Sequence, residues 1–333
     1  MPDKIEKPAI DGPDQIIEMV SAFQKSRIIL TAFELDIFTV IGSGRVTSTE
    51  VADAVKADPR GTDRLLNALC ALGFLRKEKG CFMNTGLSLR YLVKGSEDFL
   101  SRIGHSLNLY RSWGSLTDAV RAGKTVLARE YDPVSLGHFI EAMHHRAKKS
   151  AERLVSHLDL SGIRRVLDVG GGSGVYSMAF ARAKPGLQAV VLDLPRVTAL
   201  TKKYIDEAGL SASITTMDGD YNTDDFGTGY DLVFMSAIVH INSCDENVAL
   251  MARAYRSLNP GGMIVIQDHI MENDRTAPVR GALFALNMLV NTQSGDTFTE
   301  DEMRQWLEKA GCVEIKRIPT GMENDLMTGK RPA

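Results

Sequence analysis

The residues best suited to acid–base chemistry stand in the C-terminal half of the sequence, just after short apolar runs. His240 follows the apolar run 232–235, and Asp268 closes the run 263–267. A histidine between carboxylates has its tautomer fixed and its imidazolium stabilised, which suits a general base. Glu300 opens a later helical pattern and offers a second carboxylate. We therefore predict His240 as a catalytic base flanked by Asp268 and Glu300; an isolated histidine that serves only the fold is the alternative.

Three other histidines compete for a role. His269 directly follows Asp268, and successive residues of a strand point to opposite faces, so it should turn away from His240. His144 and His145 are adjacent in a helical pattern, where neighbours point about 100° apart and cannot easily share one metal. No third ligand stands at a zinc-like spacing in the sequence. We interpret this pair as a partly exposed polar edge and predict no metal site.

A glycine-rich turn stands between an apolar run and a helical pattern. Residues 166–169 are apolar except for one acid, which predicts a buried parallel strand. Helical spacing resumes over 175–183. Between them lie glycines at positions 170, 171, 172 and 174, which allow a sharp turn and a close approach of the backbone to a ligand. A strand, a glycine-rich turn and a helix together form the opening unit of a nucleotide-binding α/β sheet.

The residues around the glycines indicate which nucleotide this turn could bind. No Gly-Lys-Ser/Thr follows, which excludes a P-loop, and the spacing G-x-G-x-G fits the dinucleotide pattern poorly. Asp168 stands two residues before the first glycine; a carboxylate there would repel a pyrophosphate but suits a cationic ligand. S-adenosylmethionine is such a ligand, and we predict that Asp168, Gly170 and Gly172 bind it. An NAD-dependent oxidoreductase is the disfavoured alternative.

Three more polar residues follow later apolar runs. In open α/β sheets the ligand lies outside the carboxyl ends of the strands. Asp193 follows the run 189–192, about twenty residues after the glycines, where an acid can accept from both ribose hydroxyls; a helix N-cap is the alternative. Asp220 and Tyr221 follow the run 214–217. The Asp220 carboxylate can accept from an adenine amine, and the Tyr221 ring can cover the base. The alternative is a simple turn, in which Asp-Gly is also common.

Strand and helix patterns alternate from about residue 150 onward. Right-handed βαβ crossovers would make most strands parallel and place helices on both faces, as in a Rossmann-like α/β domain. Three patterns of the form S/T-x-x-E, at 47–50, 243–246 and 299–302, predict helix starts closed by capping boxes. The predicted sheet has seven strands, at 166–169, 189–192, 214–217, 232–235, 263–267, 313–318 and 326–330.

The first hundred residues predict a second, mostly helical domain. Helical patterns at 14–38, 47–55 and 59–72 precede a hairpin around Lys79-Gly80, which is a winged-helix arrangement. The third helical pattern carries two arginines opposed by two aspartates, which disfavours DNA recognition. The apolar first helix suits burial against another copy of the chain. A ligand-sensing, DNA-binding regulator is the alternative from another functional class.

Composition limits the classes of partner. The 333 residues carry a formal net charge of −3, which gives no large positive field and argues against a general nucleic-acid binder. The four cysteines lie far apart, without a C-x-x-C pair, so neither zinc nor a disulfide framework is expected. No apolar stretch is long enough to span a bilayer, and Met1-Pro-Asp-Lys lacks a signal-peptide pattern. These features predict a cytoplasmic protein with no membrane partner.

These motifs together resemble one protein family over nearly the whole chain. The chain is similar to the two-domain S-adenosylmethionine-dependent O-methyltransferases of the caffeate, acetylserotonin and bacterial polyketide-tailoring type. The glycine motif is shared by many methyltransferases, whereas its combination with the N-terminal module and Asp-Leu-Pro is specific. The resemblance rests on Leu69–Leu75, Val166–Gly174, Leu192–Pro195, Gly219–Tyr221, His240, Pro260–Gly262, Asn287–Leu289 and Thr299–Glu300.

The resemblance implies a winged-helix-like dimerisation domain over 1–100, a helical linker over 101–149 that lines the substrate cleft, and a methyltransferase domain over 150–333. It implies a homodimer formed through the N-terminal domain, a small-molecule acceptor and a metal-free reaction with His240 as base. Ser236 would join the cofactor site. The acceptor would lie near Phe139, Met143, Phe284, Asn287 and Met288.

Two departures from the family pattern bear on the chemistry. Ile241-Asn242 follow the histidine where Asp-Trp is common, and Ser236 stands where lysine is common four residues before it. Tyr221 also replaces a common Met or Phe. The first departure leaves an N- or C-methyl acceptor as the alternative to a hydroxyl.

Overall fold

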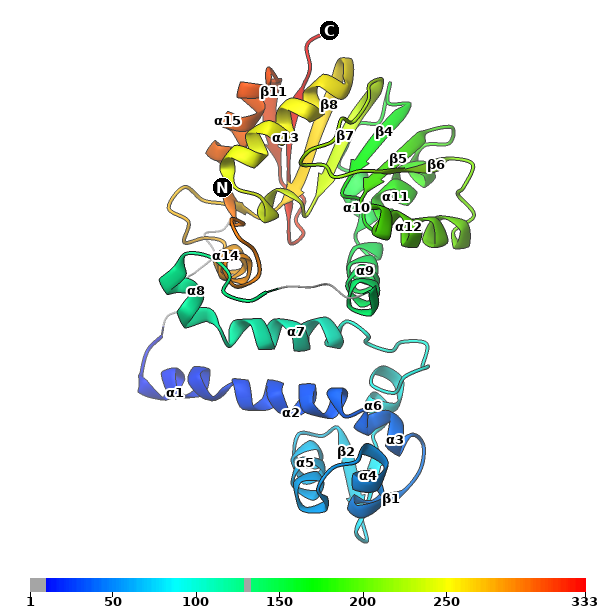
Figure 1. Cartoon of the computed structure of the whole chain (residues 1–333), viewed down its shortest axis with the longest axis vertical. Helices are drawn as coiled ribbons and strands as arrows, with labels where there is room; N and C mark the ends of the chain where they lie inside the picture. The colour runs from blue at the N-terminus through cyan, green and yellow to red at the C-terminus, as the bar shows by residue number, and fades with distance from the viewer. Residues whose placement is uncertain (1–9, 129–132) are drawn as a thin grey trace. The chain divides into compact units, whose positions relative to one another are not determined.

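The computed structural model describes residues 10–128 and 133–333. The chain forms two compact units, one ending at Arg111 and the other beginning at Ser112 (Figure 1). Residues 112–149, predicted as part of a separate linker, thus belong to the C-terminal unit. Each unit has its own hydrophobic core, and we describe them in turn.

The N-terminal unit is mostly helical and contains one small sheet. The hairpin predicted around Lys79-Gly80 is confirmed, with Leu75 opposite Asn84 and Glu78 opposite Cys81. Its sheet has the order β1-β3-β2. The elements are α1 (Pro13–Ser21), α2 (Phe23–Glu34), α3 (Ile37–Ile41), β1 (Val46–Thr47), α4 (Ser48–Val55), α5 (Pro59–Ala71), β2 (Leu75–Glu78), β3 (Cys81–Asn84) and α6 (Gly86–Tyr91); α7 (Ile103–Trp113) crosses the boundary between the units.

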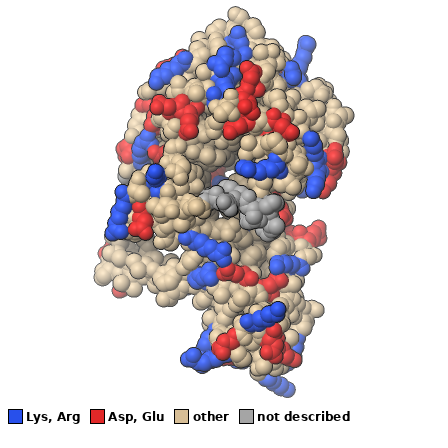
Figure 2. Space-filling view, in the orientation of Figure 1, with Lys and Arg blue, Asp and Glu red and all other residues tan. Residues whose placement is uncertain are grey.

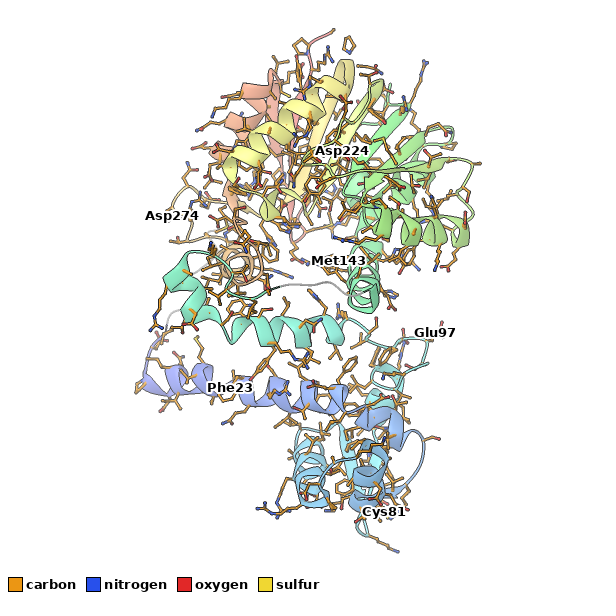
Figure 3. The ribbon with its side chains drawn as sticks, viewed as in Figure 1. Phe23, Cys81, Glu97, Met143, Asp224 and Asp274 are labelled. Atoms are coloured by element: carbon orange, nitrogen blue, oxygen red, sulfur yellow. The ribbon has the colours of Figure 1, made fainter. Side chains whose placement is uncertain are left out.

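Buried side chains of α2 to α5 and of the hairpin make the core of this unit, among them Phe38, Leu66, Leu69 and Phe82. The first helix differs, because α1 buries no residue at all. Its apolar side chains are at least half exposed, as is Phe23 at the start of α2 (Figure 3). This unit therefore presents an apolar helix that its own core does not cover.

The C-terminal unit is built on a seven-stranded sheet of order β11-β12-β8-β7-β4-β5-β6. The strands from β4 to β8 are parallel to their neighbours, and β12 and β11 close one edge antiparallel. The predicted seven-stranded α/β architecture is thus confirmed. The strands are β4 (Arg165–Val169), β5 (Gln188–Asp193), β6 (Ile214–Asp218), β7 (Tyr230–Ser236), β8 (Leu258–Asp268), β11 (Val313–Ile318) and β12 (Asp325–Lys330).

Helices cover both faces of this sheet, and the strand residues alternate between two cores (Figure 1). Leu167 and Val169 pack with α13 (Cys244–Ser257) and α15 (Glu300–Ala310). Val166, one residue before Leu167, packs on the opposite face. Because both faces are covered, the strands read as continuous apolar runs. The opposite face is covered by α10 (Ala151–Val155), α11 (Val175–Ala183) and α12 (Pro195–Glu207).

Five further elements belong to the C-terminal unit. The helix α8 (Leu116–Ala122) packs on α14 (Val279–Asn291), and α9 (Pro133–Lys148) packs on α11 and α12. The short strands β9 (Ile270–Met271) and β10 (Phe298–Thr299) pair in parallel. The capping boxes predicted at 47–50, 243–246 and 299–302 are all present.

The surface carries both signs of charge. On the face seen in Figure 2, basic and acidic side chains are interspersed over both units. Within the described residues, no helix is long and apolar enough to cross a bilayer. The same residues contain no group of three or more histidine, cysteine or acidic side chains placed to hold a metal ion.

Candidate active site

The glycine-rich turn leaves the end of β4 in a backbone conformation that few other residues adopt. Gly170, Gly172 and Gly174 have φ angles of 63°, 56° and 74°, in the left-handed region. A Cβ on Gly170 would overlap with Cδ1 of Ile238. The turn is fixed at Gly172, whose N–H donates to Oδ2 of Asp193 (2.9 Å). The φ angles therefore favour glycine at all three positions, and at Gly170 the side chain of Ile238 also stands close.

Asp168, predicted as a cofactor residue, lies fully buried beneath this turn. Ser177 Oγ donates to its Oδ2 (2.8 Å), and its Oδ1 has no hydrogen-bond partner among the described residues. Burial raises the pKa of Asp168 to about 7, the charge of Asp193 adding to the effect. A buried acceptor without a partner costs free energy, which a nearby cation or donor would recover.

Asp193 ends β5 beside the turn. Its Oδ2 accepts from Gly172, and its Oδ1 accepts from the N–H of Leu194 (2.8 Å). Burial raises the pKa of this carboxyl, while these two backbone N–H groups oppose the effect. Each carboxylate oxygen has a second lone pair, so both can still accept from ligand hydroxyls.

Asp220 and Tyr221 follow β6, as predicted. Asp220 Oδ1 accepts from the N–H of Asn222 (2.8 Å) in a local turn. The Tyr221 ring lies 3.6 Å from the position that a Cβ on Gly170 would take. Burial raises the pKa of Tyr221, and the charges of Asp193 and Asp220 raise it further. The phenol thus lies close to the glycine turn and to two carboxylates.

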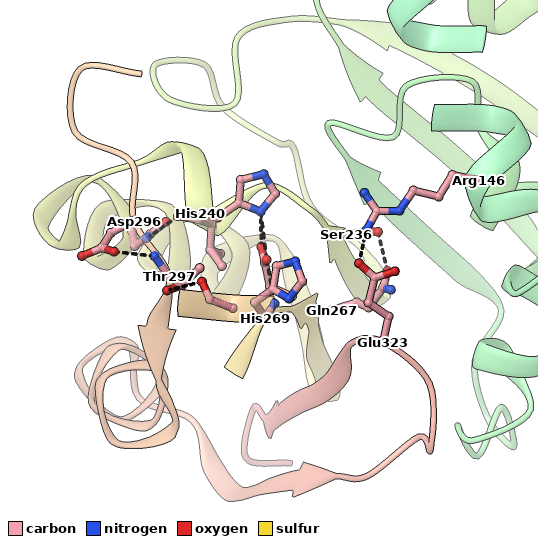
Figure 4. A network of polar contacts seen from close by, with 12 residues as sticks. Arg146, Ser236, His240, Gln267, His269, Asp296, Thr297 and Glu323 are labelled. Atoms are coloured by element: carbon pink, nitrogen blue, oxygen red, sulfur yellow. Dashed lines mark hydrogen bonds and ion pairs between the residues drawn. The ribbon is translucent and has the colours of Figure 1, made fainter. Parts of the chain in front are cut away.

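Ser236 ends β7 opposite a polar residue that the sequence did not single out. Its Oγ donates to Oε1 of Gln267 (2.5 Å), and the two residues are register partners on adjacent strands (Figure 4). Tyr176 of α11 completes the cluster, because hydrogen bonds with Ser236 and Gln267 oppose the rise in its pKa that burial causes. A polar residue closing an otherwise apolar strand was the signal for Gln267.

His240 and Asp268 meet as predicted (Figure 4). The Nδ1 of His240 lies 2.8 Å and 2.9 Å from the two oxygens of Asp268. The residues are 8% and 1% exposed, so the pair is largely shielded from water. An ionised carboxylate only accepts, so Nδ1 carries the proton and Nε2 is left as the free acceptor of the neutral ring.

The turn that carries His240 is held by two asparagines. Asn242, where the family pattern often has another residue, is 2% exposed and donates to Oδ1 of Asn247 (3.2 Å). Asn247 in turn donates to the carbonyl of Val239 (2.9 Å). The N–H of Asp296 donates to the carbonyl of His240 (3.0 Å). These hydrogen bonds therefore fix the backbone on both sides of His240.

Glu300 does not flank His240 as expected. Its carboxylate pairs with Arg304 one turn along α15 (3.0 Å) and with Arg317 of β11 (3.6 Å). Among the described residues, no hydrogen bond or ion pair joins Glu300 to His240. The guanidinium groups of Arg304 and Arg317 hold the Glu300 carboxylate instead. Within the part of the chain that the structure describes, Asp268 is the one carboxylate that pairs with His240.

His269 does not turn away from the site, contrary to the strand argument. Its ring lies 4.6 Å from the centroid of Phe284, and the ring of His240 lies 4.8 Å from the same centroid. Strand alternation fails because β8 ends at Asp268 and β9 begins only at Ile270. Burial lowers the pKa of His269 below its usual value, which keeps the ring neutral beside Phe284.

The predicted acceptor residues lie on two helices of the C-terminal unit. Phe284 contacts both imidazoles from α14, and Met288 is buried on the same helix. Asn287 accepts from Nε1 of Trp113 (3.1 Å), a tryptophan that the sequence did not indicate. Phe139 and Met143 are partly buried on α9 (Figure 3). The contact of these five residues with an acceptor stays a prediction.

His144 is a site residue that sequence reasoning missed. We expected a polar edge, but its Nδ1 lies 2.9 Å from Oγ of Ser173, within the glycine-rich turn. Its ring stacks on Tyr204 of α12 at 4.4 Å with an interplanar angle of 19°. Its neighbour His145 is exposed, near Glu141 (3.7 Å). Nothing local in the sequence distinguishes the two histidines.

The turn, Asp193 and Tyr221 form a nucleoside site with acidic character. The unpartnered oxygen of Asp168 and the spare lone pairs of Asp193 suit a ligand with a positive charge and hydroxyl groups. These features define the class as an α/β protein that can hold S-adenosylmethionine, with a histidine–aspartate pair at the adjoining strand ends.

Comparison with known proteins identifies the family. Residues 113–313 match the model of the O-methyltransferase domain, and residues 17–94 match the O-methyltransferase dimerisation domain. The chain belongs to the S-adenosylmethionine-dependent O-methyltransferase family, and its cofactor is S-adenosylmethionine.

Three relatives illustrate the likeness. The 3-hydroxy-5-methyl-1-naphthoate 3-O-methyltransferase of Streptomyces sahachiroi is 31% identical over 320 residues, 93% of this chain and 92% of that protein. The L-tyrosine C(3)-methyltransferase of Streptomyces lavendulae is 30% identical over 319 residues, 91% of this chain and 86% of that protein. The structure of human N-acetylserotonin methyltransferase in complex with SAM matches with a TM-score of 0.80 at 25% identity, covering 98% of this chain and 100% of that one.

Proposed function

We propose that this enzyme methylates a hydroxyl group of a small aromatic or enolic acceptor, with His240 as the general base. The pair formed by His240 and Asp268 is the observation that carries the proposal. Its 2.8 Å hydrogen bond and its burial present one basic nitrogen in a fixed direction.

His240 removes the acceptor proton as the acceptor oxygen gains the methyl group, and the carbon–sulfur bond of the donor would break to leave an uncharged thioether. A phenolic hydroxyl has a pKa of about 10, more than ~3 units above that of an ordinary imidazolium, so full deprotonation beforehand is unfavourable. The proton passes to Nε2, and the Asp268 carboxylate stabilises the imidazolium that results. Orientation of the acceptor oxygen adds to the acceleration, because a bound near-attack geometry replaces a random encounter.

The cofactor residues bind and orient one ligand. When bound, S-adenosylmethionine supplies an electrophilic methyl group on a positively charged sulfur. Asp193 accepts from the ribose hydroxyls, Asp220 accepts from the adenine amine and Tyr221 covers the base. The negative charge of these acids favours the cationic donor over neutral competitors. The remaining residues proposed for this site are Asp168, Gly170, Gly172 and Ser236.

The acceptor lies beside Phe284 in this proposal, close to the imidazole. A flat ring suits the aromatic face of Phe284, which already contacts His240 edge-on at 84°. The relative from Streptomyces sahachiroi is named for the methylation of an aromatic hydroxyl. The further acceptor residues proposed are Phe139, Met143, Asn287 and Met288.

A methyl-transfer assay tests this function. Purified enzyme with labelled S-adenosylmethionine is offered phenols, naphthols, quinols and anilines, and the methylated position is assigned by mass spectrometry and NMR. Methyl ethers are expected from the hydroxyl compounds. Methylation of ring carbon, as in the name of the relative from Streptomyces lavendulae, or of nitrogen alone would contradict the proposed acceptor.

We also propose that the enzyme is a homodimer through its N-terminal unit. The helix α1 buries none of its residues, although Ile17, Met19 and Val20 are apolar and at least 66% exposed. Residues 17–94 match a dimerisation domain. Light scattering should give twice the chain mass, and Ile17→Asp with Val20→Asp should give the monomer. A wild-type monomer at micromolar concentration would contradict the proposal.

A further inference from the structure

The helix α9 lies against the glycine-rich turn through one of its faces. Ile140 reaches to 3.9 Å from the position that a Cβ on Gly172 would take. One turn further along the helix, His144 makes its hydrogen bond with Ser173 Oγ at 2.9 Å. Residues four apart lie on the same side of a helix. This face of α9 therefore covers the segment that holds the cofactor.

The imidazole of His144 is held by contacts with two other elements of the protein. It stacks on Tyr204, which belongs to α12, while its Nδ1 is engaged by Ser173. Ser173 is itself only 4% exposed. The contact thus joins three elements, α9, α12 and the turn after β4, through one side chain.

Two other hydrogen bonds also hold the turn. Gly172 donates its N–H to Asp193 of β5 and accepts at its carbonyl from Oγ1 of Thr201 (2.5 Å), on α12. His144 supplies the support from α9. Since the cofactor residues Gly170 and Gly172 belong to this turn, loss of any one support would let the cofactor site relax.

An adjacent face of α9 carries two of the predicted acceptor residues. Phe139, Met143 and Arg146 recur at spacings of three and four residues, one side of a helix. Arg146 pairs with Glu323 of the β11–β12 loop (Figure 4). Glu323 also pairs with Arg280 of α14 at 2.6 Å. One helix therefore contacts the cofactor turn through His144 and, through Arg146, a loop residue that also pairs with α14.

We propose that His144 is a positioning residue that ties α9 to the cofactor turn, so that a filled cofactor site orders the helix that lines the acceptor region. The inference uses the S-adenosylmethionine site of the family and does not depend on which group acts as base. His144 makes no chemical step. Its hydrogen bond to Ser173 couples the conformation of the turn to that of α9.

A double-mutant cycle on cofactor affinity tests the bond. The dissociation constant of S-adenosylhomocysteine is measured calorimetrically for the wild type, His144→Ala, Ser173→Ala and the double variant. Each single change should weaken binding about five- to twentyfold, and the double variant should be no weaker than about the worse single one, because both remove one hydrogen bond. Additive losses, or unchanged affinity in both single variants, would overturn the proposal.

Two controls separate positioning from general damage. His145→Ala changes the neighbouring, exposed histidine and should alter affinity less than about twofold. His144→Asn places an amide near the position of Nδ1 and should restore affinity to within about threefold of the wild type. If His144→Ala fails to fold, Ser173→Ala carries the test, since it removes only a hydroxyl. Equal losses in His145→Ala and His144→Ala would count against the inference.

Hydrogen exchange tests the link to the helix. In the wild type, saturating S-adenosylhomocysteine should slow exchange of the α9 amides over residues 139–148 several-fold. In His144→Ala, also saturated, most of that protection should disappear while protection of the turn at 170–174 persists. Unchanged protection of α9 in the variant would show that the helix is ordered without His144.

Discussion

The imidazoles of His240 and His144 both have their Nδ1 atoms engaged by a side chain, but their surroundings differ in charge. His240 faces the carboxylate of Asp268, whereas His144 faces the hydroxyl of Ser173. A carboxylate stabilises the proton that a general base receives, and a hydroxyl offers no such charge. The first site can stabilise a positive charge on its imidazole, whereas the second offers no charge that would do so.

The environment of His144 reinforces that neutrality. Burial, together with the charges of His145, Lys148 and Arg182, lowers its pKa to about 4. A neutral ring adds no positive charge beside a site for a cationic cofactor. The comparison teaches that the partner of Nδ1 separates a candidate base from a positioning histidine.

Removal of the base should have the largest effect. His240→Ala is expected to lower turnover by about 10²–10⁴-fold, because proton removal is lost, while cofactor affinity stays nearly unchanged. Steady-state kinetics and calorimetry with S-adenosylhomocysteine measure the two quantities. His145→Ala is the matched control and should leave both near the wild-type values. Near-normal turnover in His240→Ala would take His240 out of the mechanism.

Replacing the Asp268 carboxylate by a neutral amide should remove the difference in charge between the partners of His240 and His144. Asp268→Asn leaves His240 with a neutral partner, as His144 has, and should lower turnover by roughly 10²-fold through the wrong tautomer and an unsupported imidazolium. Cofactor affinity is again the internal control. A variant with full turnover would show that the carboxylate only supports the fold.

The smallest expected effect is a difference in acid stability. The folded-state pKa of His144 is about 4 against a usual 6.5, so the unfolded chain takes up the proton first as the pH falls. The stability contributed by the neutral ring is present above pH 6.5 and is lost as the pH drops towards 4. Urea unfolding at several pH values should show a smaller decline for His144→Asn than for the wild type. Parallel declines would mean that His144 titrates normally.

Much of the fold could be predicted because its signals are local. The apolar runs gave the parallel strands of the C-terminal unit, since both faces of the sheet are covered and no alternation is needed. The capping boxes at Thr47, Ser243 and Thr299 each depend on residues three apart. Asp268 could be placed near His240 because the carboxyl ends of parallel strands meet at one edge.

The parts that could not be predicted depend on contacts between distant segments. Glu300 starts its helix as expected, but Arg317, on a strand that follows, helps to draw its carboxylate away from His240. His144 and Ser173 are 29 residues apart, and only the packing of α9 on α11 and α12 brings them together. His269 points towards Phe284 because the strand breaks after Asp268, which no periodicity reveals.

The buried carboxyl beneath the glycine turn has a consequence for how the donor and its product exchange. Because its pKa is raised to about 7, Asp168 is partly protonated in neutral solution. A sulfonium nearby favours the ionised form, so uptake of S-adenosylmethionine should expel a fraction of a proton, and the uncharged thioether should expel less. Binding heats compared in buffers of different ionisation enthalpy report that difference. Asp168 would lose part of a proton when S-adenosylmethionine binds and regain it when the thioether product replaces the donor. The relative affinity for donor and product would therefore depend on pH near neutrality.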